Sequence, residues 1–97
     1  MNRQPAIYLL TNRPYVTLYT GVTGCLPRRI WQHRNKVIKG FTASYNLNRL
    51  VHYELFEDMY EAISREKQMK AGSRKNKISL IDKINPDWRD LYPEICL

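Results

Sequence analysis

The hydrophobic pattern of the chain begins with two short strand-like segments and continues with helix-like ones. Residues 6–11 are almost wholly apolar, which is typical of a strand buried on both faces. Residues 15–20 are rich in β-branched and aromatic side chains and predict a second strand, and residues 12–14, Asn-Arg-Pro, favour a turn between the two. Residues 50–56 predict a third strand, after a polar surface loop over residues 41–49.

Three helices are predicted between and after these strands. The first runs from Pro27 to about Ile38, because proline suits a first helical turn and a glycine follows at position 40. The second begins at the capping box formed by Asp58 and Glu61 and ends at Gly72 as a C′ residue. The third is capped by Ser73 and stops at residues 85–86, Asn-Pro.

This order, β-β-α-β-α-α, predicts an α+β fold in which a small, mostly antiparallel three-stranded sheet is flanked by helices. The length of 97 residues fits one domain, expected to span residues 1–97. The third helix presents apolar positions at Ile78, Leu80, Ile81 and Ile84, and Trp88 and Leu91 in the tail are expected to fold back on the core.

Glu66 interrupts the apolar stripe of the second predicted helix, which is otherwise made by Ala62, Ile63 and Met69. A lone buried carboxylate is costly, so Glu66 requires a partner, a metal or a function.

The first hairpin and first helix bring four chemically active side chains together. If the turn spans residues 12–15, Tyr8 lies directly opposite Tyr19 and the two phenols project from one face of the sheet. Arg29 and His33 are four residues apart and therefore share a face of the helix.

Charge is distributed unevenly along the chain. The net charge is +7, and residues 1–53 contain eight basic residues and no acidic one, whereas all nine acidic residues follow. Such a one-sided field attracts a polyanion, and nucleic acid is the expected partner. No segment is long and apolar enough to span a bilayer, no signal peptide is recognised, and a cytoplasmic location is expected.

The motifs place these residues in a known context. Ala6-Ile7-Tyr8, Tyr19-Thr20-Gly21, the helix segment from Leu26 to His33 and the segment from Ala62 to Lys70 occur in this order. In this the chain resembles the GIY-YIG nuclease superfamily, and among its members the small stand-alone bacterial UPF0213-type proteins. Ala6 and Thr20 depart mildly from the family pattern, and Val22 stands where DNA-repair members carry a lysine.

The resemblance implies a metal-dependent endonuclease that hydrolyses phosphodiester bonds in DNA, with a structure-specific or damage-related role left open. Glu66 would hold one Mg²⁺ or Mn²⁺ ion, and Arg29 would clamp the scissile phosphate. Tyr8 is favoured as the base with Tyr19 as its hydrogen-bond partner, and the reverse assignment stays open. His33 and Arg29 are the protein cations available to lower a tyrosine pKa.

A second group of residues is predicted to contact the nucleic acid around this centre. Most are basic and supply electrostatic attraction, Tyr45 could contact a phosphate or a base, and Asn85 matches a late polar residue of the family. The set is Arg28, Arg34, Lys36, Lys39, Tyr45 and Asn85.

Other interpretations of these residues stay open at this stage. The protein could be a non-catalytic nucleic-acid-binding module on the same fold, or a nuclease subunit that is active only with a partner, and a homodimer is also open. His33 could be a solvated histidine, and Glu66 could form a structural ion pair with Arg29. Trp31 and Trp88 are interpreted as packing residues, and His52 has no visible partner. No membrane and no small-molecule cofactor are expected.

Overall fold

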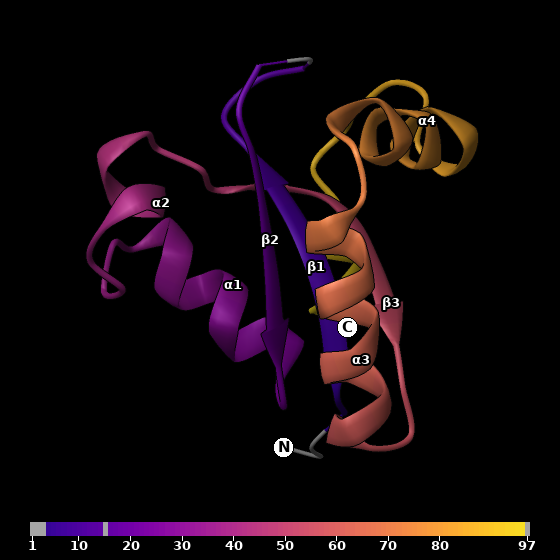
Figure 1. Cartoon of the computed structure of the whole chain (residues 1–97). Coiled ribbons are helices and arrows are strands. Elements are labelled where there is room, and N and C mark those ends of the chain that lie inside the picture. Colours follow the sequence, from indigo (N-terminus) through magenta and orange to yellow (C-terminus); the bar gives the residue numbers. More distant parts are fainter. Residues whose placement is uncertain (1–3, 15, 97) are drawn as a thin grey trace.

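The computed structural model describes residues 4–14 and 16–96. The elements are β1 (Ala6–Thr11), β2 (Leu18–Thr23), α1 (Leu26–Arg34), α2 (Phe41–Ser44), β3 (Arg49–Leu55), α3 (Met59–Ala71), α4 (Arg74–Ile84) and α5 (Tyr92–Ile95). The strands form one antiparallel sheet in the order β2-β1-β3 (Figure 1). The predicted α+β fold with a three-stranded antiparallel sheet is therefore confirmed.

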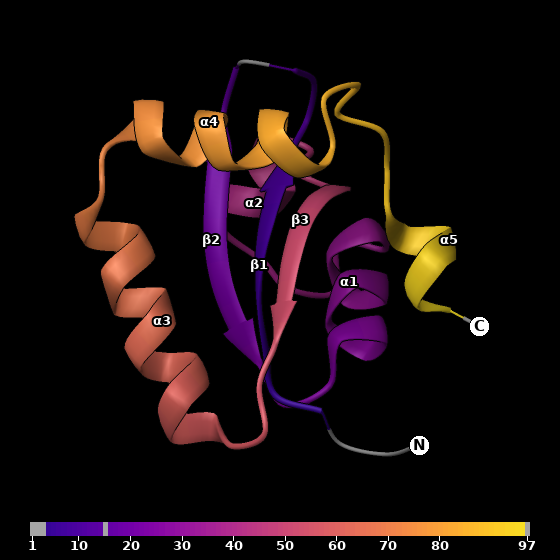
Figure 2. The ribbon, with the colours of Figure 1, turned by 90° about the vertical axis from the view of Figure 1, so that its right-hand side faces the viewer.

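The central strand β1 is buried along its whole length, as its apolar sequence predicts. Residues that alternate along it enter two separate cores, one on each face of the sheet. One core contains Tyr8 together with Ile30 of α1, and the other contains Ile7 together with Ala62 of α3 and Ile81 of α4. Figure 1 shows α1 and α2 on one side of the sheet and α3 and α4 on the other, and Figure 2 shows α5 beside α1.

The register of the first hairpin differs from the predicted one. Tyr8 pairs with Gly21 and Tyr19 pairs with Leu10, so the assumption that Tyr8 lies opposite Tyr19 is wrong by two positions. The loop is longer than predicted, and β2 starts at Leu18 rather than at residue 15. Tyr15, the predicted first residue of that strand, lies outside the described residues.

A shift of two residues preserves the face of the sheet to which each side chain points, since strand side chains alternate with a period of two. The rings of Tyr8 and Tyr19 consequently remain neighbours on the diagonal, with centroids 6.3 Å apart. The predicted pairing fails, but the predicted proximity of the two phenols holds.

The first helix is shorter than predicted. Helix α1 ends at Arg34 rather than near Ile38, and Lys36 adopts a left-handed backbone with φ of 54°. Within the segment predicted as a loop, residues 41–44 form the one-turn helix α2. Strand β3 begins one residue earlier than predicted, at Arg49.

The caps of the later helices follow the sequence. The Asp58 carboxylate accepts a hydrogen bond from the Glu61 N–H at 2.8 Å, and the Ser73 hydroxyl accepts one from the Asn76 N–H at 3.0 Å. Helix α3 ends before Gly72, as predicted, although Gly72 has a φ of −75° and makes no left-handed turn.

The packing of the last helices matches the predicted apolar positions only in part. Ile81 and Met69 are buried, whereas Ile63 and Ile84 are exposed, because α3 and α4 each bury only a narrow stripe against the sheet. Trp88 and Leu91 fold back into the two cores as predicted. No helix among the described residues is long and apolar enough to cross a membrane.

Candidate active site

The candidate site is built around the buried phenol of Tyr8. Its ring lies across Gly21, so close that a Cβ atom at position 21 would stand 2.3 Å from Tyr8 Cζ. Glycine at this position therefore leaves the space that the ring occupies. Tyr8 is only 1% exposed, whereas Tyr19 beside it is partly exposed.

His33 closes the site from α1. Its Nε2 lies 2.9 Å from the Tyr8 hydroxyl and its Nδ1 lies 3.1 Å from Thr42 Oγ1, so both ring nitrogens have partners. The His33 ring also contacts the ring of Tyr19, with centroids 5.8 Å apart. His33 is 4% exposed, which contradicts the interpretation of a solvated histidine.

Burial, followed by the nearby Arg29 guanidinium, lowers the pKa of His33 to about 4. His33 is therefore neutral at pH 7 and does not act as the cation that the sequence suggested for lowering a tyrosine pKa. In the neutral imidazole one nitrogen donates and the other accepts, so Thr42, His33 and Tyr8 form one continuous hydrogen-bonded chain.

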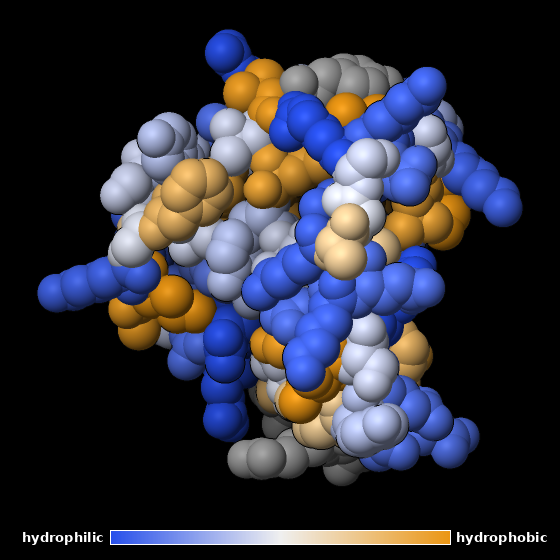
Figure 3. Space-filling view, in the orientation of Figure 1, coloured by the Kyte–Doolittle hydropathy of each residue, from blue (hydrophilic) through white to orange (hydrophobic). Residues whose placement is uncertain are grey.

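Arg29 and Glu66 act on the same hydroxyl from two different helices. Burial and the neighbouring Tyr19 raise the pKa of Tyr8, while the adjacent Arg29 guanidinium opposes this shift and the Glu66 carboxylate adds to it. Helix α3 packs on β2 and β1 from the opposite face of the sheet, and its Glu66 carboxylate still acts on the Tyr8 hydroxyl. Figure 3 views the face between α1 and α3, where hydrophilic side chains gather over α3.

Glu66 keeps a partly buried carboxylate on this face. Its side chain is 16% exposed, and its Oε2 atom lies 3.2 Å from Lys70 Nζ one turn along α3. The ion pair with Arg29 that the sequence left open is not formed. The lysine partner is flexible and half exposed, so the carboxylate can be shared with another cation.

The donor set fits a hard divalent cation bound mainly by water. Within residues 4–14 and 16–96 no group of three or more histidine, cysteine or acidic residues could enclose a metal ion. Mg²⁺ retains most of its waters and takes one or two protein carboxylates, and Glu66 supplies one. The residues present are therefore compatible with a Mg²⁺ or Mn²⁺ ion at Glu66.

Three residues of the predicted nucleic-acid group are freely available, since Arg28, Lys36 and Lys39 are exposed. Tyr45 is exposed too, and its ring packs on that of Phe41 with centroids 4.8 Å apart.

Two other members of that group have structural partners. The Arg34 guanidinium pairs with Asp90 at 2.5 Å and lies 4.7 Å above the ring of Tyr92, which ties α1 to the C-terminal segment. Asn85 is buried, and its amide donates to the carbonyls of Val51 and Arg89. The amide donors of Asn85 are therefore used by the backbone, and its contact with nucleic acid stays a prediction.

Sequence reasoning missed two residues of the site and one cluster outside it. The motif Tyr19-Thr20-Gly21 contains Gly21 without indicating its contact with Tyr8, and Thr42 gives no signal because its segment is typical of a loop. His52, for which the sequence shows no partner, lies 2.8 Å from Glu54, and Arg65 also binds Glu54. The hydrogen bond from His52 is the largest of the effects that lower the pKa of Glu54 to about 2.

The neutral His33 predicts a specific pH dependence of stability. Because His33 has a pKa of about 4 in the folded protein and about 6.5 when unfolded, the unfolded chain binds the extra proton between these values and stability falls as the pH drops. Between pH 7 and pH 4.5 we expect the wild type to lose about 2 kcal/mol more unfolding free energy than His33→Gln. Urea unfolding of both proteins at the two pH values measures the difference, and other groups largely cancel. Equal losses in both proteins would contradict a buried neutral His33.

With the geometry in place, comparison with known proteins defines the family. The model of the GIY-YIG catalytic domain matches residues 4–79. The chain therefore belongs to the GIY-YIG nuclease superfamily. Membership of this family implies nucleic-acid binding in general.

Its relatives belong to one small group within that family. A UPF0213 protein of Clostridium perfringens is 40% identical over 65 residues, covering 67% of this chain and 70% of the relative. A UPF0213 protein of Syntrophus aciditrophicus is 38% identical over 72 residues, covering 73% of this chain and 82% of the relative. A UPF0213 protein of Staphylococcus saprophyticus is 35% identical over 65 residues, covering 67% of this chain and 79% of the relative. The resemblance to UPF0213-type proteins is thus confirmed. No solved structure matches the chain.

Proposed function

We propose that the protein is a metal-dependent endonuclease that hydrolyses phosphodiester bonds in DNA, acting on one phosphate beside Tyr8, Tyr19, Arg29 and Glu66. One observation carries the proposal. The buried Tyr8 hydroxyl, bonded to His33, lies under the electrostatic influence of both a guanidinium and a carboxylate, which come from helices on opposite sides of the sheet. Structural tyrosines do not require such a pair of charges.

Arg29 binds the phosphate in this proposal. Its planar guanidinium matches two phosphate oxygens at once and is always charged, so it stabilises the negative charge that develops as water attacks. Its place beside the Tyr8 hydroxyl brings that phosphate to the phenols.

The two tyrosines take different parts. Tyr8 is almost fully buried and its hydroxyl is already engaged by His33, whereas Tyr19 reaches solvent. We therefore assign the activation of the attacking water to Tyr19 and a positioning role to Tyr8. This reverses the assignment that the sequence favoured.

The hydrogen-bonded chain behind Tyr8 links the direction of its proton to the tautomer of His33. If Thr42 donates to Nδ1, the neutral His33 donates from Nε2 to the Tyr8 oxygen. The Tyr8 O–H then points away from His33, and it can donate to a phosphate oxygen or to the Tyr19 oxygen.

Glu66 is the residue that would hold the divalent ion, together with water. Such an ion would supply Lewis-acid stabilisation of the leaving oxygen.

The proposal is tested by cleavage of labelled duplex, nicked, flap and four-way-junction DNA by the purified chain, with Mg²⁺, with Mn²⁺ and with EDTA. Metal-dependent cutting of at least one substrate supports it. Binding without cutting would favour a binding module, and cutting only after addition of cell extract would favour a subunit that needs a partner. An RNA counterpart of each substrate tests the choice of DNA.

A further inference from the structure

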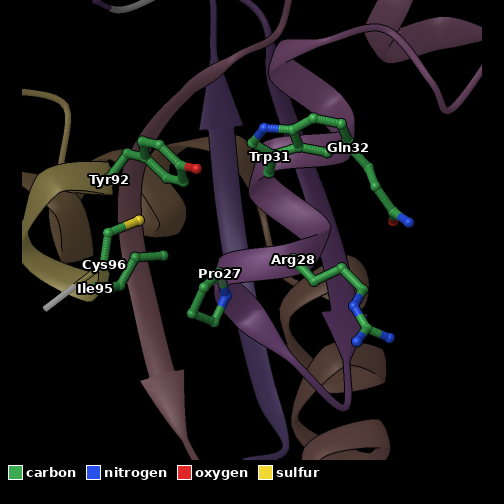
Figure 4. A pocket seen from close by; sticks show the side chains of 7 residues that line it. All are labelled: Pro27, Arg28, Trp31, Gln32, Tyr92, Ile95 and Cys96. Carbon is green, nitrogen blue, oxygen red and sulfur yellow. The ribbon is translucent and has the colours of Figure 1, made fainter. Parts of the chain in front are cut away.

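A cavity lies outside the candidate active site, between α1 and α5. It has a volume of about 670 Å³ and is lined by Pro27, Arg28, Trp31, Gln32, Tyr92, Ile95 and Cys96. Figure 4 shows α1 and α5 facing each other across it, with the Trp31 and Tyr92 rings near one end and Pro27 and Ile95 lower down. This volume is within the usual range of small-molecule sites, about 300–1,000 Å³.

Trp31 is the most unusual residue of this cavity. Its side chain is 51% exposed, whereas the other tryptophan of the chain, Trp88, is 1% exposed. Trp31 therefore contributes little to the core and is at most a partly buried packing residue. A half-exposed indole beside a second aromatic ring is a surface on which a planar group can stack.

The charge of the cavity favours an anionic ligand. Arg28 is exposed at its edge, Gln32 offers an amide, and within residues 4–14 and 16–96 no carboxylate lines the cavity. The nearby Asp90 is already paired with Arg34. A planar ligand that carries negative charge and hydrogen-bonding edges matches this combination, and a nucleotide has all three properties.

The same helix connects the cavity to the candidate active site. Arg28 and Arg29 are consecutive, so their Cα atoms are about 3.8 Å apart, and they point to different sides of α1. Arg29 belongs to the Tyr8 cluster, whereas Arg28 lines the cavity. One nucleic-acid strand could therefore contact both residues.

We propose that the cavity binds an unpaired nucleobase of the DNA strand whose neighbouring phosphates lie along α1, with the base stacked on Trp31. This inference rests on the proposed function, since it supplies that site with a preference for substrates that contain unpaired bases. Bases in an intact duplex are already stacked on each other and cannot enter, so plain duplex gains nothing from Trp31.

The experiment measures binding without cleavage, in EDTA and at one fixed salt concentration. Flap DNA, single-stranded DNA and blunt duplex are titrated into wild type, Trp31→Ala and Tyr60→Ala. Tyr60 is a matched control, because it is an aromatic residue that is 81% exposed on α3. Circular dichroism checks that the variants remain folded.

We expect Trp31→Ala to weaken binding of flap and single-stranded DNA about tenfold and to leave duplex binding unchanged. Tyr60→Ala is expected to bind all three as the wild type does. Unpaired bases should also quench tryptophan fluorescence of the wild type, and Trp31→Phe should abolish this signal since Trp88 is buried.

Equal binding by wild type and Trp31→Ala, or quenching by duplex as strong as by single strands, would overturn the proposal. A tryptophan emission maximum that shifts with protein concentration in the absence of DNA would also overturn the proposal. The occupant of the cavity would then be a second copy of the chain. These readouts need no cleavage. If the wild type binds flap DNA through Trp31 but cuts no substrate, the proposed nuclease activity is refuted. The proposed nucleobase site at Trp31 is then still supported.

Discussion

Gly21→Ala is expected to damage both stability and activity, although it adds only one methyl group. The new Cβ would stand 2.3 Å from Tyr8 Cζ and 2.4 Å from its hydroxyl oxygen, so the ring has to move. Tyr8 is 1% exposed and bonded to His33 at 2.9 Å, so moving its ring disturbs both the core and this hydrogen bond. Overpacking of this kind costs about 2–3 kcal/mol, which lowers the melting temperature of a domain this small by about 10–20 °C.

The same displacement should reduce cleavage at least about 100-fold at a temperature where the variant is folded, because a shift of about 1 Å in a catalytic group has that effect. Gly24→Ala is the matched control. A Cβ at position 24 meets nothing within 4 Å, so stability and activity should stay close to those of the wild type. If Gly21→Ala melted and cleaved like Gly24→Ala, the placement of the Tyr8 ring across Gly21 would be wrong.

Arg29→Ala is expected to lower kcat about 10³-fold while changing DNA affinity little. Arg29 would bind the scissile phosphate most strongly when negative charge develops in the transition state, and removal of such a group lowers kcat more than it weakens ground-state binding. Single-turnover cleavage at saturating protein separates the two quantities.

Arg28→Ala removes the same charge from the adjacent position and serves as the control. Arg28 is exposed and lines the α1–α5 cavity, so its loss should weaken binding and leave kcat within a few-fold of the wild type. Equal effects of the two substitutions on kcat would show that Arg29 supplies general electrostatic attraction and does not bind the scissile phosphate.

Local signals predicted the framework of the fold and much of the proposed site. The caps at Asp58 and Ser73 are satisfied within a few residues of chain, so sequence spacing locates them well. The same holds for the neighbourhood of Tyr8 and Tyr19, because an error of two in register does not change the face of a strand.

Long-range contacts could not be predicted in this way. Arg34 reads as a free cation in the sequence, yet its partner Asp90 is 56 residues away. His33 is buried because α2 brings Thr42 over it, and nothing in the polar segment around Thr42 signals a helix. Asn85 resembles a site residue by position alone, whereas its amide holds the backbone of β3 and the tail.

Glu66 distinguishes a metal-dependent catalytic centre from a buried tyrosine cluster, so its role is the central claim. The most direct test is the rate at which Glu66→Gln cleaves the best substrate of the DNA panel in Mg²⁺, compared with wild type and with Glu57→Gln. Glu57 is an exposed acid that precedes α3 and is a matched control. The predicted result is cleavage by Glu66→Gln at the level of wild type in EDTA, with DNA binding retained, and unchanged cleavage by Glu57→Gln. Mg²⁺-dependent cleavage by Glu66→Gln at the wild-type rate would contradict the proposed site.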